Sequence, residues 1–253
     1  MAINPYLIDY DFPADPLYTY GDLGVAAFSG VARSLYADEA PVYPEKDWPD
    51  LVRLANGGCS KLVTRIYDQK NEGSCVANAC SQAHEIIQAY QFGRDLVTHL
   101  SAISLYKRIG RSANSGAMVS DGLDEMAEKG VLPLDNPENR AKYGAHVMPN
   151  TGFRTAYPAG WEATAARFKA HEWLIVDSVN ELISALLNQH PVVVGRSGHS
   201  ICYCDPVYQG SSLLVKYVNS WGDWGEQGFG YDSSRLIRSS ASWAFALRSV
   251  VIP

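Results

Sequence analysis

Cys75 opens the longest helical pattern in the chain, and this junction constrains the fold more than any other feature. The apolar residues that follow share one helical face: Val76, Ala79, Cys80, Ala83, Ile86, Ile87 and Tyr90. A cysteine in the first turn of a helix meets unpaired backbone N–H groups and the positive end of the helix dipole. Both favour the thiolate, which is the nucleophilic form. The pattern therefore predicts a reactive cysteine at the start of a helix over Cys75–Tyr90.

Two polar residues near the C-terminus complete a set of nucleophile, base and orienting group. His199 stands at the start of a predicted strand, and Asn219 begins the turn after the next strand. An imidazole can exchange the proton of the thiol, and an asparagine can hold the imidazole in place. We therefore predict Cys75, His199 and Asn219 as the catalytic residues.

The segments around these residues resemble the papain-like (C1) cysteine peptidases. Gln69 precedes Cys75 by six positions, with Gly-Ser directly before the cysteine, as in that family. The run Asn219-Ser220-Trp221-Gly222, followed by Trp224-Gly225-Glu226-Gln227-Gly228-Phe229, is similar to the family's second signature. His199 and Asn219 also follow the cysteine at close to the family spacing of roughly 130–150 residues.

The resemblance implies roles for further residues. Gln69 is expected to form the oxyanion hole together with the backbone N–H of Cys75. Trp221 is expected to shield the hydrogen bond between His199 and Asn219 and to line the substrate site. The segment Ser115-Gly116-Ala117 and the residue Ser200 are similar to positions that line the family's substrate cleft. No metal or organic cofactor is implied.

Four departures from the family pattern are visible. Val76 replaces the usual aromatic residue after the nucleophile, and Glu72 stands where many secreted members carry a disulfide cysteine. The connection between the predicted strand at Val192–Gly195 and His199 is much shorter than in relatives. Residues 1–41 are short for an inhibitory prosegment and lack its helical character, so the sequence does not predict control by a prosegment.

Helical patterns dominate the first part of the chain and strand patterns the last part, which predicts an α+β protein. The resemblance implies two lobes with a cleft between them, the second lobe an antiparallel, barrel-like sheet. We expect an N-terminal arm over 1–41 and a peptidase domain over 42–253, with a helical lobe at about 60–150 and a β lobe at about 151–253. Beyond the first helix, the expected helices are Ser101–Ile109, Ser120–Glu128 and one from Ser178 to Leu187. The expected strands are Val192–Val194, Ser200–Cys204, Leu213–Val218 and Ala244–Ile252.

The first 41 residues differ in composition from the rest, being acidic, rich in proline and rich in tyrosine. Five tyrosines within this length are too many for a solvated tail. We interpret the segment as an extended arm that lies either on its own domain or on a protein partner, and the sequence leaves both open.

Composition excludes several functional classes. A net charge of −6 argues against nucleic acid as a partner, and no apolar run approaches the ~20 residues of a membrane span. The N-terminus lacks the features of a secretory signal. Five cysteines cannot all pair, which together with the absent signal predicts reduced thiols. We therefore expect a cytoplasmic location or one in a virion or other assembly.

The remaining cysteines invite a metal hypothesis. Cys202 and Cys204 follow His199 closely, but in a regular strand they point to the opposite face from it. They are therefore expected to be core residues, and no metal site is predicted. Cys59, after two glycines, is expected to be the exposed and oxidisable thiol.

The predicted function is peptide-bond hydrolysis through a thioester on Cys75, with a peptide or protein as substrate. Two alternatives stay open. One is a binding or structural module that has kept the fold with little turnover. The other is deamidation, amide transfer or isopeptide cleavage, which share the acylation step. The natural substrate, the oligomeric state and the activation route do not follow from the sequence.

Overall fold

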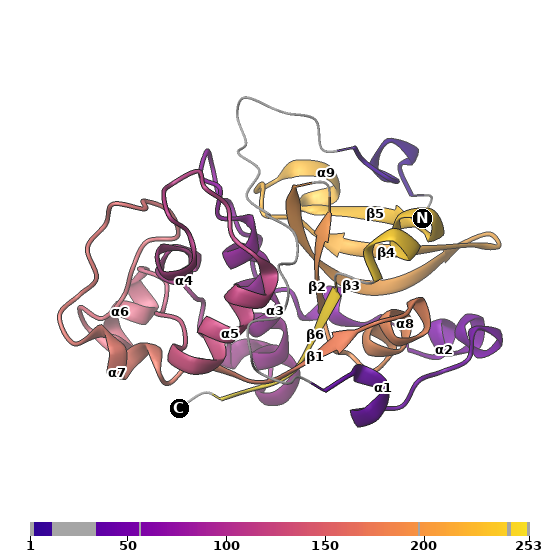
Figure 1. Ribbon diagram of the computed structural model, residues 1–253, viewed down its shortest axis with the longest axis horizontal. Helices are drawn as coiled ribbons and strands as arrows, with labels where there is room; N and C mark the ends of the chain where they lie inside the picture. The colour runs from indigo at the N-terminus through magenta and orange to yellow at the C-terminus, as the bar shows by residue number, and fades with distance from the viewer. Residues whose placement is uncertain (1–2, 12–33, 56, 197, 242–243, 252–253) are drawn as a thin grey trace.

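The structure is a computed structural model that describes residues 3–11, 34–55, 57–196, 198–241 and 244–251. Its centre is a six-stranded antiparallel sheet in the order β1-β6-β2-β3-β4-β5. The strands are β1 (Lys169–Val176), β2 (Val192–Arg196), β3 (His199–Gln209), β4 (Ser212–Val218), β5 (Phe229–Ser233) and β6 (Ala244–Val251). Helices α4, α5, α6 and α7 lie on one side of the sheet with α3 between them and the strands, whereas α8 lies on the other side (Figure 1). The mixed helical and antiparallel architecture predicted from the sequence is confirmed.

The α-helices vary from single turns to one long element. They are α1 (Tyr36–Glu39), α2 (Trp48–Leu54), α3 (Cys75–Phe92), α4 (Ala102–Ile109), α5 (Val119–Lys129), α6 (Pro137–Tyr143), α7 (Trp161–Ala165), α8 (Val179–Leu187), α9 (Trp224–Gln227) and α10 (Ser234–Ser240). Short 3₁₀ turns are η1 (Pro5–Leu7), η2 (Glu45–Asp47), η3 (Cys59–Leu62) and η4 (Arg94–Leu96). Within the described residues, no helix is both long and apolar enough to cross a membrane.

Helix α3 is the shared wall of the fold. Its residues from Cys75 to Ala89 are all buried, because other helices cover one side of it and the sheet covers another. One apolar core joins α3, α4 and α5 to the sheet face that carries Val193 and Cys202. A second core fills the opposite sheet face against α8 and α10. Helix α3 is therefore fixed by burial along most of its length.

The predicted helices are confirmed, and side-chain caps explain where two of them begin. The Ser101 hydroxyl accepts the N–H of Ser104 at the start of α4, and the Ser178 hydroxyl accepts the N–H of Glu181 at the start of α8. Helix α5 ends at Gly130, whose φ of +76° favours glycine.

The strand β3 alternates as expected. Cys202 and Cys204 lie in the core shared with α3, whereas Ile201 and Tyr203 lie in the core on the other face. The predicted strand at 200–204 is longer in the structure, because β3 continues to Gln209 opposite β4.

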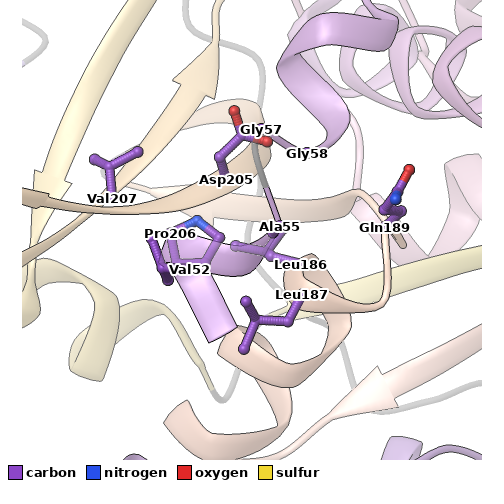
Figure 2. Close-up of a pocket in the computed structure, with 10 residues that line it drawn as sticks. All are labelled: Val52, Ala55, Gly57, Gly58, Leu186, Leu187, Gln189, Asp205, Pro206 and Val207. Atoms are coloured by element: carbon purple, nitrogen blue, oxygen red, sulfur yellow. The ribbon is translucent and has the colours of Figure 1, made fainter. Parts of the chain in front are cut away.

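The expectation for Cys59 is wrong. Its side chain is completely buried, and burial raises the pKa of its thiol. The cause is local packing of η3 on β3, where Asp205 accepts hydrogen bonds from the N–H of Ser60 (3.1 Å) and from its hydroxyl. Figure 2 shows Asp205 beside Gly57 and Gly58 at a pocket of about 130 Å³ between α2, α8 and β3. Two glycines before a cysteine therefore marked a turn that packs inward.

The two edge strands, β1 and β5, were not predicted. In β1 the register shifts twice, between Ala170 and Trp173, so the period-two pattern is broken. β5 is five residues long and follows the glycine-rich turn, which hides its pattern.

The N-terminal arm is attached at two places in its described parts. Ile8 bridges Tyr231 on β5, and the N–H of Asp9 donates to the carbonyl of Tyr231 (2.8 Å). At the other edge of the sheet, Leu35 bridges Ile175 on β1, and Tyr36 is completely buried. The described parts of the arm thus lie on this chain's own sheet. The remaining arm residues, 1–2 and 12–33, fall outside the described part of the chain.

Candidate active site

The start of α3, where Cys75 lies, is held by a network of side-chain amides. Cys75 is the first residue of α3, and its side chain is fully buried. One turn later, Asn78 donates to the carbonyl of Ser74 (2.8 Å) and to its hydroxyl (3.0 Å). Asn150 in turn donates to Asn78 Oδ1 (3.2 Å) and to the carbonyl of Asp68 (3.1 Å). The turn that enters the helix is therefore held from within.

Gln69 is oriented at both ends of its side-chain amide. Its Oε1 accepts the hydroxyl of Ser220 (2.6 Å), and its Nε2 donates to the carbonyl of Glu72 (2.8 Å). Its backbone N–H donates to the carbonyl of Ser220 (2.9 Å). The loop before the nucleophile is thereby joined to the residue that follows Asn219.

His199 and Asn219 contact each other directly. His199 Nε2 lies 2.8 Å from Asn219 Oδ1, which also accepts the N–H of Ser220 (2.8 Å). The Trp221 ring packs on the imidazole with centroids 4.9 Å apart and planes tilted by 37°. The indole thus contacts the imidazole, and its role as a shield of the hydrogen bond between His199 and Asn219 stays a prediction.

The hydrogen bonds assign the tautomer of the imidazole. Because a backbone N–H points at Asn219 Oδ1, that atom is the carbonyl oxygen, and the hydrogen must lie on His199 Nε2. In the neutral ring, Nδ1 is then the basic nitrogen. Burial lowers the pKa of His199 to about 4, the hydrogen bond to Asn219 acts in the opposite sense, and the charge of Arg196 lowers the pKa further. A neutral imidazole at pH 7 is a proton acceptor.

Helix α3 meets strands β3 and β4 at a small cavity. Its lining comes from both sides: Tyr67, Asn78, Ala79, Gln82, Ser200, Val218, Asn219 and Ser220. A β-bridge between Asp68 and Trp221 closes the same junction. Hydrogen bonds thus connect His199 to Asn219 and Gln69 to the adjacent Ser220, and the side chains of Gln69, Cys75, His199 and Asn219 are all buried.

The residues predicted to line the substrate cleft lie in different settings. Ser115 is half-buried, and its hydroxyl accepts the N–H of Arg111 and of Ser112. The N–H of Gly116 donates to Tyr106 Oη (3.1 Å), and Ala117 is buried in the core. Ser200 is buried, with its hydroxyl donating to the carbonyl of Val194 (3.1 Å). Their role toward a peptide stays a prediction.

Two residues near the site escaped the sequence reasoning. Tyr106 Oη contacts Gly116 and donates to the carbonyl of Ser112 (2.9 Å); burial raises the pKa of its phenol, and the proximity of Cys75 adds to this. Ser220 holds Gln69 and lies inside the motif that was recognised, so the motif itself carried that signal. Tyr106 lies on α4, and no local pattern marks it.

Comparison with known proteins gives structural neighbours only. Neither a protein-family model nor a curated protein matches the sequence. Among solved structures, xylellain, a cysteine protease from Xylella fastidiosa, is similar with a TM-score of 0.65 and 17% identity, over 93% of this chain and 98% of xylellain. Digestive procathepsin L2 proteinase from the larval midgut of Tenebrio molitor has a TM-score of 0.64 and 17% identity, over 92% of this chain and 78% of its own.

A recombinant stem bromelain precursor is similar with a TM-score of 0.57 and 15% identity, over 94% of this chain and 78% of its own. These neighbours share the helices-beside-sheet architecture at an identity too low to carry over catalytic residues. The chain therefore has the fold of the papain-like cysteine proteases.

Proposed function

We propose that this chain is a papain-like thiol hydrolase that cleaves peptide bonds. The observation that carries the proposal is the 2.8 Å contact between His199 Nε2 and Asn219 Oδ1 beneath Trp221, at the junction with the loop that leads to Cys75. The contact leaves Nδ1 as the base. A helix N-terminus supplies the setting in which a thiolate is stable.

The reaction begins when His199 Nδ1 takes the proton of Cys75 and the sulfur attacks the peptide carbonyl carbon. The oxyanion that forms accepts hydrogen bonds from Gln69 Nε2 and from the Cys75 N–H. Ser220 and the Glu72 carbonyl fix the plane of the Gln69 amide, so this donor needs little reorganisation. The protonated imidazole then gives its proton to the departing amine, and a thioester remains.

Deacylation reverses the roles. His199 Nδ1 removes a proton from water, the resulting hydroxide adds to the thioester, and the sulfur leaves as the acid product forms. Asn219 keeps the proton on Nε2 throughout, which holds the ring in one tautomer.

The complete burial of Cys75, Gln69 and His199 favours a second candidate, a papain-fold binding module with little turnover. Both candidates keep the same fold. They differ in whether the Cys75 thiol is activated as a thiolate that a small electrophile can reach.

The rate of Cys75 alkylation by iodoacetamide between pH 4 and 9, read by peptide mass spectrometry, tests the proposal. We expect labelling well below the free-thiol pKa of ~8.5 and loss of this low-pH labelling in His199→Ala. Cys59, Cys80, Cys202 and Cys204 are equally buried and serve as internal controls. If Cys75 labels like these four, the binding module is the better description. If Cys75 labels at low pH as expected, assays with peptide, isopeptide and glutamine substrates would separate hydrolysis from related acyl transfers.

A further inference from the structure

The imidazole sits at the end of a very short hairpin. In the register of β2 and β3, Arg196 pairs with His199 and Gly195 pairs with Ser200. His199 is therefore the first residue of its strand, next to the turn, and no long loop buttresses it. A ring at such a position needs support from other elements to keep its hydrogen bond to Asn219.

The first support is a buried charge cluster around Arg196. Its guanidinium forms an ion pair with Asp232 on β5 and donates to the backbone carbonyl of Tyr10 in the N-terminal arm. Tyr203 Oη donates to the other oxygen of Asp232 (2.6 Å). The side chains of Arg196 and Asp232 are 5% and 0% exposed. A guanidinium this deeply buried needs acceptors for its donors, and the arm provides one of them.

The second support is a row of aromatic rings that ends on the imidazole. Tyr10 packs edge-to-face on Trp224, with centroids 5.0 Å apart. Trp224 meets Trp221 edge-to-face at 5.9 Å, and Trp221 covers His199. The ring of Tyr10 thus limits the movement of Trp224, and through Trp221 the position of the imidazole.

The arm is anchored where it delivers these groups. The Asp9 carboxylate accepts the N–H and the hydroxyl of Ser233, each at 2.7 Å. The N–H of Asp9 donates to the carbonyl of Tyr231, so Tyr10 is held between β5 and the hairpin.

We propose that Asp9, Tyr10, Arg196, Trp224 and Asp232 form an arm clamp that positions His199 for its reaction with Cys75. The inference rests on the proposed thiol chemistry and adds a role for the arm. Tyr10 and Arg196 act as positioning residues, and neither touches the reacting atoms. The arm replaces, on the histidine side, the support that a longer β2–β3 loop would give.

Point variants of the full chain test the arm clamp without removing the arm. Tyr10→Ala keeps the backbone carbonyl but removes the ring from Trp224, and Tyr10→Phe restores the ring. Arg196→Lys keeps a charge for Asp232 but loses the fork that also reaches Tyr10. Tyr6→Ala is the matched control, because Tyr6 lies in the same arm and is 85% exposed.

We expect the low-pH alkylation of Cys75 to fall roughly tenfold or more in Tyr10→Ala and Arg196→Lys, since a small displacement of the base has a large effect. Tyr10→Phe and Tyr6→Ala should match the parent. The double variant Tyr10→Ala/Arg196→Lys should label no more slowly than the slower of the two single variants, as expected for residues that act as one unit. Unchanged or faster labelling in Tyr10→Ala would overturn the clamp.

Hydrogen exchange of the segments 198–203 and 219–224 provides a readout that does not depend on thiol chemistry. We expect faster exchange there in Tyr10→Ala and unchanged exchange in α4 and α5. Equal protection of these two segments in the parent and in Tyr10→Ala would refute the arm clamp even if Cys75 were inert. Conversely, ordinary labelling of Cys75 in the parent chain would refute the proposed function while exchange still reported on the clamp.

Discussion

The two halves of the candidate site are secured in different ways. Cys75 begins an 18-residue helix that is buried on most sides, and neutral amides of Asn78 and Asn150 hold its entry turn. His199 begins a strand at a hairpin end and depends on a buried ion pair and on an arm from the other end of the chain. Cys75 is thus held by a buried helix and neutral amide hydrogen bonds, and His199 by a buried charge cluster and the N-terminal arm. Substitutions on the Cys75 side should therefore lower the free energy of unfolding with little effect on alkylation, whereas substitutions on the His199 side should change both.

The largest effect is expected on the histidine side, from Asp232→Ala. The substitution leaves Arg196 buried beside an empty position, and breaking a buried pair in this way costs about 3–5 kcal/mol. Urea unfolding measures the change. Asp135→Ala is the control, because Asp135 pairs with Arg140 at the surface, where ion pairs contribute about 0–1 kcal/mol. Equal losses in the two variants would show that the buried pair of Arg196 and Asp232 contributes no more to stability than a surface ion pair.

Acid should weaken the nucleophile side through His84, which is buried in the middle of α3. Burial lowers the pKa of His84 to about 4, whereas an unfolded histidine titrates near 6.5. The unfolded state therefore binds the proton more tightly. The contribution of neutral His84 to the free energy of unfolding is complete above pH 6.5 and is lost as the pH falls toward 4. Between pH 7 and pH 5 the loss from this group is about 2 kcal/mol.

Urea unfolding of the parent and of His84→Gln at both pH values checks this prediction. The variant should show a smaller drop between pH 7 and pH 5, because it lacks the titrating group. A drop of the same size in both proteins would assign the acid sensitivity to other groups, such as His190, whose pKa burial also lowers to about 4.

The same contrast explains what the sequence could predict. The helix after Cys75 was predictable because its stripe repeats over four turns, and the motif around Asn219 contained the residue that contacts His199 and the indole that packs on it. The arm contacts were not, because Tyr10 and Arg196 are 186 positions apart and neither belongs to a periodic pattern. Cys59 was misplaced for a similar reason, since its burial follows from a contact between Ser60 and the distant Asp205.

Asn78→Ala probes whether the neutral amides matter to the nucleophile. The variant removes the side-chain donor to Ser74 and the acceptor for one Asn150 bond, while the backbone N–H of residue 78 still donates to the Ser74 carbonyl (3.0 Å) and Asn150 still donates to Asp68. Losing these hydrogen bonds costs about 1–3 kcal/mol in total. Because α3 is held by burial elsewhere, the pH profile of Cys75 alkylation should shift little. Asn136→Ala, which removes the cap of α6, is a control of similar cost. If Asn78→Ala loses the low-pH alkylation of Cys75 and Asn136→Ala keeps it, both sides of the site control the reactivity of Cys75.

The smallest effect is expected from Glu72→Gln, at the position where many secreted relatives carry a disulfide cysteine. The Glu72 carboxylate accepts the N–H groups of Gly152 and Phe153 at 2.8–3.1 Å, a tie between the nucleophile loop and the segment that follows Asn150. Glutamine keeps one acceptor oxygen without the charge, so unfolding should become easier by about 1 kcal/mol. Alkylation of Cys75 should stay within about twofold of the parent, since Gln69 Nε2 donates to the backbone carbonyl of Glu72, which the substitution retains. A tenfold fall in alkylation would mean that the nucleophile depends on a charged tie as the base does, and the distinction between the two halves would fail.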